Sequence, residues 1–346
     1  MGRLARIVLG IPAREVRAAE RALGPERGPL RDRFLALGES FQEGYHAALA
    51  DPRPEALAAR LAAVERELQG FACEGAGMGL TMLDLLAPGR PRRFAAFAAG
   101  AGSPQIYMLH AGAGWALARL PIAPRRLVDR LDPLHGWMVL DGLGFHYSLF
   151  HRAAAIERGE VPARISGYAR RPFDVGVGRS LWFFERADPG RIARRLARFP
   201  RERRSELWSG LGEAAAYAGG GERPALEELR RAAGPWLPSF AQGVSFSAET
   251  RERAGNPAPH TELACQVIWG AGAAEVAAAV RASAAGLPPD GEVPAFEVWK
   301  RRIGERLADF SAARRRAGAG GGPPAAEPVS GPCAPASPSG RERSRS

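Results

Sequence analysis

The sequence predicts an all-α protein built from helical hairpins that repeat about every 34 residues, as in a tetratricopeptide-like α-solenoid. Three observations support this fold class. A Gly-x-Gly step at Gly142 recurs at Gly176 and again at Gly210, an interval of 34 residues each time, and a fixed period of that size is typical of stacked helical repeats. Apolar residues recur at three- and four-residue steps, which indicates amphipathic helices. Much of the 46% hydrophobic share is alanine, which favours closely packed helices.

The chain divides into three predicted parts. Residues 1–30 are a polar lead-in with one short helix near 13–23. Residues 31–310 form the helical-repeat domain. Residues 311–346 are rich in Gly, Pro and Arg and carry too little apolar surface to fold, so we expect a disordered tail.

Helices in the repeat domain alternate with breaks at proline and glycine. The first, Arg33–Ala50, places its apolar residues on one face, and the proline-rich turn at Asp51 starts a second. Gly-x-Gly steps beginning at Gly77 and Gly112 continue the period upstream, with intervals of 35 and 30 residues that indicate variable connections. The period therefore extends over most of the domain.

The unit that begins at Trp208 matches the tetratricopeptide pattern best. Leu211 and Gly212 follow at the expected positions, Ala215 lies beyond them, and Pro235 closes the unit. The other units keep the length and the glycine but not the full consensus.

Proline sets two helix starts in the middle of the chain. Asp188 is a predicted N-cap, with Pro189 at the first helical position, and this helix ends at Pro200. Pro172 cannot lie inside a helix, so we expect a helix to begin there.

The glycine steps also approximate a dinucleotide-binding fingerprint, but the surroundings do not fit one. That site needs a buried strand before the glycines and occurs once in a domain. Here the preceding segments are not β-branched, and the step occurs five times. We therefore interpret the glycines as notches that let neighbouring helices approach closely.

Charge and cysteine usage exclude several functional classes. The net charge of +11 would suggest nucleic acid or an anionic membrane as a partner. Acidic residues interleave with the arginines, however, and Lys300 is the only lysine, so nucleic acid is not the expected partner.

The cysteines Cys73, Cys265 and Cys333 are far apart, and we expect the first two to be buried. The chain shows no signal peptide and no apolar run long enough to span a membrane, so a cytoplasmic protein is expected.

Polar residues beside the glycine notches are the candidate site residues, because the inner helices of such an array line one concave surface. Glu43, His46 and Glu213 belong to this group. Asp141, His146 and His151 are spaced by five and cannot share a helix face, so no metal site is predicted; no cofactor is indicated either. The candidate catalytic residues are Glu74, His110, Asp141 and His146, and the candidate binding residues are Asp174, Arg179, His260 and Glu262.

Each candidate also has a structural interpretation. For Asp141 a buried hydrogen-bonded group or a charge on a helix face is favoured over catalysis, and for His260 and Glu262 a helix cap is favoured. Arg170, Arg171 and Arg179 near Asp174 suit a carboxylate or phosphate, or ordinary ion pairs.

Several motifs together resemble a bacterial family of unknown function whose members occur beside enediyne polyketide synthases. These are GFACEGAGMGLTMLD, MLHAGAGWALARL, LDGLGFHYSLFH, GYARRPFDVGVGRSLWF, LWSGLGEAAAYAGG and HTELAC, and they cover roughly Arg33 to Arg302. The resemblance implies a role in enediyne-type polyketide biosynthesis. It brings no reaction and no catalytic residues.

Two functions follow as hypotheses. In the first, the protein is an accessory factor that binds a polyketide pathway enzyme or a polyene intermediate on its concave face. In the second, it is an enzyme that modifies the polyene or the enediyne core by acid/base chemistry. An accessory factor predicts an open groove with exposed aromatic and arginine residues, and an enzyme predicts an enclosed apolar pocket where polar residues converge. A third class, nucleic-acid binding, requires a continuous arginine stripe.

Overall fold

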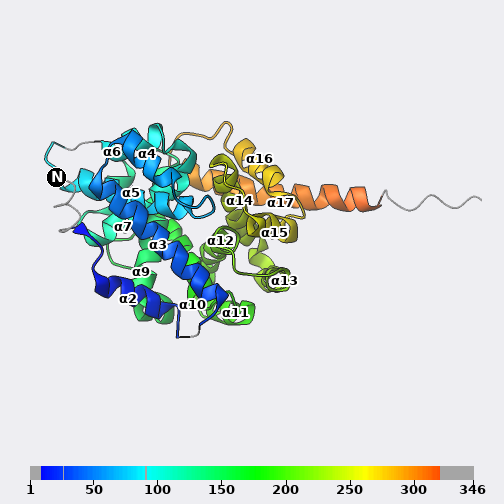
Figure 1. The fold of residues 1–346 in the computed structure, drawn as a ribbon. Helices are drawn as coiled ribbons and strands as arrows, with labels where there is room; N and C mark the ends of the chain where they lie inside the picture. Colours follow the sequence, from blue (N-terminus) through cyan, green and yellow to red (C-terminus); the bar gives the residue numbers. More distant parts are fainter. Residues whose placement is uncertain (1–8, 26, 90–91, 320–346) are drawn as a thin grey trace, which may run out of the picture.

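The computed structural model describes residues 9–25, 27–89 and 92–319, and within these ranges the chain forms helices and turns without any β-strand (Figure 1). The all-α prediction is confirmed. A row of helices runs through the fold, each packed against the next in chain order. The row consists of α3 (Pro29–Ala50), α5 (Gln69–Leu86), α7 (Ile106–Arg119), α9 (Met138–Phe150), α10 (Arg170–Phe184), α12 (Arg201–Tyr217), α14 (Leu237–Arg253) and α16 (Ala273–Ser283).

Other helices flank or connect the members of the row. They are α2 (Ala13–Ala22), α4 (Pro54–Ala62), α6 (Arg93–Ala99), α8 (Pro124–Val128), α11 (Pro189–Leu196), α13 (Arg223–Ala233), α15 (Pro259–Ile268) and α17 (Ala295–Ala319), with 3-10 turns at Ser103–Gln105, His135–Trp137 and Gly234–Trp236. The connection from α9 to α10 is different. It holds the π-helical segment η3 (Ala153–Glu157) and the 3-10 turn η4 (Gly167–Ala169) in place of an α-helix.

The predicted proline signals agree with the helix starts. Asp188 caps α11, where its side chain accepts a hydrogen bond from the Arg191 backbone N–H at 2.7 Å. Pro172 lies in the first turn of α10, which begins two residues earlier, at Arg170. Backbone N–H groups in a first turn have no intrahelical partner, so proline costs no hydrogen bond there.

The two glycines of each Gly-x-Gly step face opposite neighbours. Residues i and i+2 of an α-helix point about 200° apart, so one glycine meets the preceding helix and the other the following helix. A Cβ on Gly142 would lie 1.8 Å from the Ala111 carbonyl oxygen of α7, and one on Gly144 would lie 2.0 Å from the Phe173 oxygen of α10. The same arrangement recurs at Gly176 and Gly178 and at Gly210 and Gly212.

In α5 the glycine pair is shifted by two residues from the predicted Gly77 and Gly79. Gly75 faces α3, where a Cβ would lie 1.8 Å from the Phe41 carbonyl oxygen, and Gly77 faces α7. Gly79 returns to the α3 side, one turn after Gly75. Because the run CEGAGMGLT holds three glycines at alternate positions, spacing alone did not identify the pair that contacts both neighbours.

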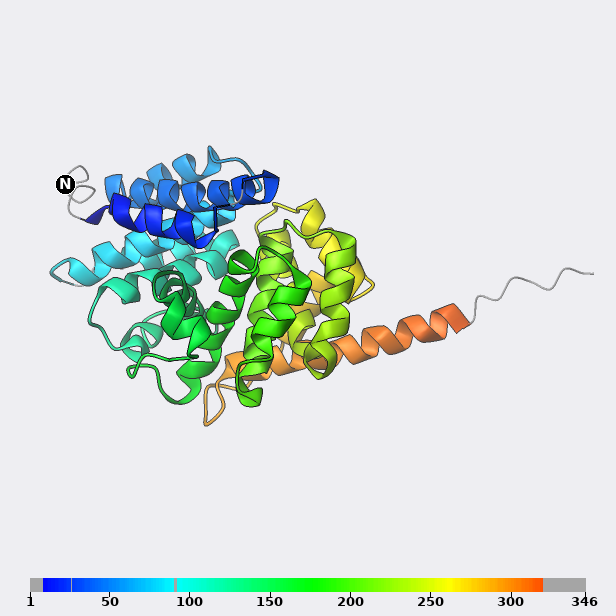
Figure 2. The same cartoon turned by 90° about the horizontal axis from the view of Figure 1, so that it is seen from below.

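The row bends back so that the C-terminal ends of α12 and α14 meet the start of α5 (Figure 2). Arg251 donates hydrogen bonds to the carbonyl oxygens of Glu67 and Tyr217 at 2.8 and 2.7 Å. The Phe71 and Tyr217 rings lie 5.3 Å apart across the same junction. Side chains therefore fill the space that an open solenoid would leave as a groove.

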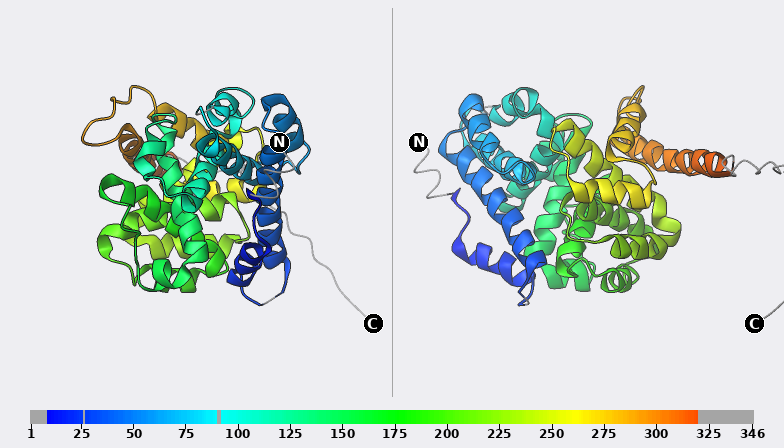
Figure 3. Two further views of the ribbon diagram at one scale, coloured as in Figure 1. Left: turned by 90° about the vertical axis from the view of Figure 1, so that its left-hand side faces the viewer. Right: turned by 45° about the vertical axis from the view of Figure 1, so that its right-hand side comes forward.

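The C-terminal helix α17 packs by its first turns and then leaves the body of the fold (Figure 3). Phe296, Trp299 and Ile303 are buried against α14 and α16. The predicted disordered tail begins at residue 311, but α17 continues as a helix to Ala319; residues 320–346 lie outside the described residues. No single helix in the described ranges is long and apolar enough to cross a membrane; α15 and α16 meet that test only as a pair bent by 71°.

Candidate functional site

A cavity of about 320 Å³ opens between α2 and α3 on one side and α9 and α10 on the other. Helices α5 and α7 form its deeper wall. Aromatic side chains dominate the lining, and aliphatic residues of α2 and α3 complete it. The aromatic members are Phe34, Phe41, Phe71, Trp115, Phe145, Phe150, Phe183 and Phe184.

Helix α2 covers one side of this aromatic cavity. Ile11, Val16 and Leu23 contribute to the lining. Glu15 of α2 forms an ion pair with Arg119 of α7, which holds the helix in place. The sequence predicted this helix but not its position over a cavity.

Two charged residues meet in the deep wall of the aromatic cavity, Glu74 of α5 and Arg179 of α10. The Arg179 Nη2 atom lies 3.3 Å from Glu74 Oε1, and its Nη1 atom donates to Asp141 Oδ2 at 2.6 Å. The Trp115 indole N–H also donates to Glu74 Oε1, at 3.3 Å. One buried guanidinium is thus shared by two carboxyl groups from different helices.

A second, smaller cavity of about 50 Å³ lies behind this pair. Asp141, Arg179 and Glu213 line it, and Arg179 borders both cavities. The Asp141 Oδ1 atom is buried and accepts no hydrogen bond from the described residues. None of the residues that the structure describes donates a hydrogen bond to the Glu213 carboxyl group.

Burial changes the protonation of this group of residues. It raises the pKa of Glu74 and of Asp141, against the opposing attraction of Arg179. The pKa of Glu213 is raised further, well above its ordinary value, by burial and then by repulsion from Asp141. Burial and the neighbouring Asp141 therefore favour the neutral form of the Glu213 carboxyl group, against the attraction of Arg179 and Lys300.

Of the predicted catalytic residues, Glu74 and Asp141 share Arg179, whereas neither histidine lines the two cavities. His146 packs against Trp115 and Phe150, with ring centroids 5.2 and 4.6 Å away, and burial lowers its pKa to about 3. His110 makes a hydrogen bond with the Ile106 carbonyl oxygen at 2.7 Å, and burial lowers its pKa to about 4. Both rings are therefore neutral around pH 7.

Of the predicted binding residues, only Arg179 joins the site. Asp174 accepts two hydrogen bonds from Arg203, at 2.9 and 2.6 Å. His260 makes a hydrogen bond with the Tyr217 carbonyl oxygen at 2.9 Å, and Glu262 accepts one from the backbone N–H of Ala273 at 2.7 Å. These three residues join helices to one another, away from the aromatic cavity.

Of the remaining candidates, only Glu213 lies at the site. Glu43 is exposed on α3, and the His46 ring packs 5.6 Å from that of Tyr45. Cys73 and Cys265 are buried as predicted, while Cys333 falls outside the described ranges. Among the residues that the structure describes, no group of three or more His, Cys, Asp or Glu is placed to hold a metal ion.

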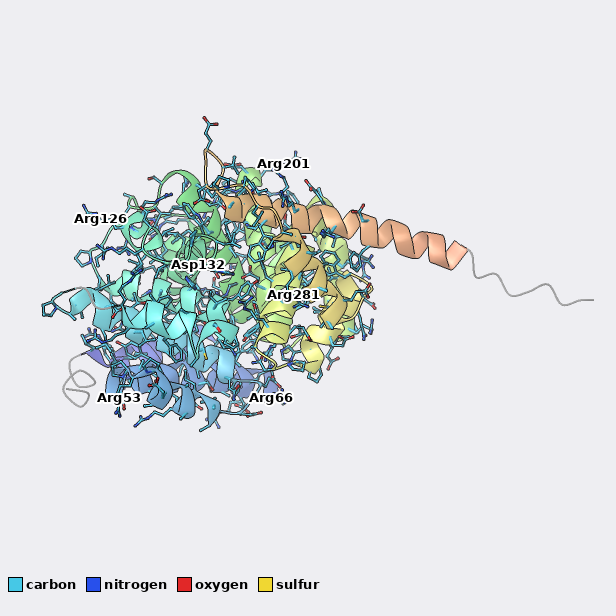
Figure 4. All side chains as sticks on the ribbon, turned by 90° about the horizontal axis from the view of Figure 1, so that it is seen from above. Arg53, Arg66, Arg126, Asp132, Arg201 and Arg281 are labelled. Atoms are coloured by element: carbon cyan, nitrogen blue, oxygen red, sulfur yellow. The ribbon has the colours of Figure 1, made fainter. Side chains whose placement is uncertain are left out.

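The arginines labelled in Figure 4 project from separate parts of the surface. They are Arg53, Arg66, Arg126, Arg201 and Arg281, from five different segments of the chain. Some are engaged in the fold: Arg66 donates a hydrogen bond to the Gly255 carbonyl oxygen at 3.0 Å, and Arg281 forms an ion pair with Glu249. These labelled residues do not form one stripe.

The geometry can be set beside known proteins. No curated protein and no solved structure matches the chain. One family model matches residues 1–307 and carries the description "Protein of unknown function (DUF1702)". That match covers all the helices of the row and every residue of the site, and we conclude that the chain belongs to the DUF1702 family.

Proposed function

We propose that this protein binds an elongated, apolar and conjugated small molecule in the aromatic cavity. The observation that carries the proposal is the cavity itself, because about 320 Å³ falls within the range of small-molecule sites and its lining is mainly aromatic. The resemblance to proteins encoded beside enediyne polyketide synthases suggests the ligand class, a polyene intermediate of an enediyne-type pathway.

An enzyme fits this arrangement better than an accessory factor with an open groove. Glu74 and Arg179 meet in the deep wall of the cavity, and Asp141 and Glu213 lie behind them, as expected of an acid/base site. Glu74 lies in the cavity wall and would exchange a proton with the ligand. Glu74 would take a proton from one carbon and return it to another, so that the reaction is a proton transfer that moves a double bond or assists a ring closure. Asp141 and Glu213 lie behind it and would set the proton affinity of Glu74 through the charge that they place around Arg179.

The accessory role remains the second candidate. In that case the ligand is held and passed to a pathway enzyme without chemical change. The aromatic lining supports this role as well, because it could hold an apolar ligand without taking part in any reaction.

Binding can be tested with retinol as a conjugated polyene probe, by the loss of tryptophan fluorescence on titration. We expect saturation at one probe per chain. Gly38→Phe should abolish it, because Gly38 lines the cavity and has open space where a side chain would project. Glu43→Phe places the same ring on the exposed side of α3 and should bind as the unaltered protein does. Equal binding by both variants would place the ligand elsewhere.

The acid/base role needs a separate experiment in a strain that carries the gene. Deletion should abolish the pathway product, and complementation with Asp141→Asn or Glu213→Gln should fail to restore it. Glu43→Gln serves as the matched control and should restore it fully. If the two site variants restore full production, the protein acts by binding alone.

A further inference from the structure

The charged residues that line the aromatic cavity are almost all acidic. They are four glutamates, Glu15, Glu20, Glu39 and Glu74, and one arginine, Arg179. This composition is the reverse of the whole chain, which carries a net charge of +11. The surface charge of the protein therefore does not indicate which ligand its cavity accepts.

The single arginine is already paired with two carboxyl groups of the protein. Its two terminal nitrogens are used by Asp141 and Glu74, at 2.6 and 3.3 Å, and its guanidinium lies over the Phe145 ring at 5.1 Å. Asp141 and Glu213 lie directly behind it. A carboxylate entering from the cavity would add another acid to a buried group that already holds more carboxyl groups than cations, which is costly in a desolvated site.

The deep wall instead offers a hydrogen-bond acceptor. Both hydrogen bonds that described residues donate to Glu74 end on Oε1, which leaves Oε2 for a ligand. The faces of the surrounding aromatic rings carry partial negative charge, so they attract a cation and repel an anion.

Building on the proposed function, we infer that the cavity takes an apolar ligand whose buried end is a hydrogen-bond donor, either a hydroxyl or a protonated amine, and that it rejects the corresponding carboxylate. A polyketide chain would then reach this protein only after its carboxyl end has been reduced or removed, so a reductive or decarboxylating step must precede it.

Three probes with the same polyene chain test this inference: retinol, retinylamine and retinoate, each titrated into the full-length protein at neutral pH. We expect retinol and retinylamine each to bind at least about tenfold more tightly than retinoate, a difference of about 1.4 kcal/mol. A smaller difference, or tighter binding of retinoate, overturns the inference but leaves the cavity as a polyene site. If none of the three binds, the proposed function itself fails.

A variant pair identifies the residue responsible. Glu74→Gln should lower the affinity for retinylamine and reduce the difference in affinity between retinylamine and retinoate. Glu43→Gln, on the exposed side of α3, should leave all three affinities unchanged. If the folded Glu74→Gln variant shows the same difference in affinity between retinylamine and retinoate as the unaltered protein, Glu74 is not the residue responsible. Should that variant fail to fold, the series on the unaltered protein still decides the inference.

Discussion

Two glutamates on α12 show how the same side chain can serve the fold or face a cavity. Glu206 and Glu213 are seven residues apart, which places them two turns apart on one face of the helix. Glu206 is bound by Lys300 and by Arg171, whose Nε and Nη2 donate to Oε1 at 2.9 and 2.6 Å. Glu213 has no such donor among the described residues and borders the inner cavity.

The pKa values of the two residues differ in direction for that reason. Burial alone would raise both. At Glu206 the attraction of Lys300 and Arg171 outweighs burial, and its pKa lies below the ordinary value of 4.5. At Glu213 burial and the neighbouring Asp141 act together, and its pKa lies well above that value. The ion-paired Glu206 carboxylate stabilises the fold, whereas the Glu213 carboxyl group, which has no hydrogen-bond donor among the described residues, favours its neutral form beside the smaller cavity.

The largest effect should come from removing the partner of the matched glutamate. Lys300 is buried, so Lys300→Met leaves Glu206 with Arg171 alone and should lower the free energy of unfolding by about 3 kcal/mol. Urea denaturation measures this. The double variant with Glu206→Gln removes the unpaired charge and should recover most of the loss. If Lys300→Met unfolds at the same urea concentration as the unaltered protein, the ion pair does not support the fold.

An intermediate effect should come from the glycine between the two glutamates. A Cβ on Gly210 would lie 1.8 Å from the Val175 carbonyl oxygen, so Gly210→Ala must push α12 away from α10, which carries both Arg171 and Arg179. We expect a loss of about 1–3 kcal/mol in thermal or urea unfolding.

Gly38 supplies the control for that substitution. It lies in α3 with nothing within 4 Å of an added Cβ. Gly38→Ala should therefore stabilise the protein slightly, by up to about 1 kcal/mol, through helix propensity. Equal effects at the two positions would contradict the close approach of α10 and α12.

The finest test compares the pH dependence of stability in Glu206→Gln and Glu213→Gln. A lowered pKa stabilises the folded state above pH 4.5 and the benefit is lost as the pH falls, so Glu206→Gln should be less stable than the unaltered protein at neutral pH and approach it in acid. A raised pKa has the opposite sign. Glu213→Gln should therefore gain stability relative to the unaltered protein as the pH rises above 4.5. Parallel curves for the two variants would contradict the comparison.

Short-range chemistry in the sequence predicted much of the fold. Proline and Asp188 determine helix starts through local hydrogen bonding, and glycine beside alanine indicates close helix contact wherever it occurs. Glu74 and Asp141 were candidates because they lie beside glycine notches, and Arg179 because its guanidinium suits a carboxylate; Arg179 contacts both carboxyl groups.

Features that depend on distant segments could not be predicted in this way. The row closes through Arg251, whose partner Glu67 lies 184 residues away in the chain. Lys300 reaches Glu206 only because α17 returns across α12 and α14, and no local pattern marks it. The signal for Glu213 was its place next to Gly212, but spacing gives no information on whether a carboxyl group finds a cation. Spacing likewise gave no information on where the rings of His110 and His146 would pack.

The single lysine also has a practical consequence for chemical labelling. Apart from the amino terminus, Lys300 is the only amine in the chain, and it is 7% exposed and held by Glu206. Amine-reactive dyes and lysine-directed cross-linkers should therefore leave the folded body almost untouched. Lys300 would react only when the first turns of α17 separate from the core. The rate of its modification, followed by mass spectrometry, would therefore measure this local opening.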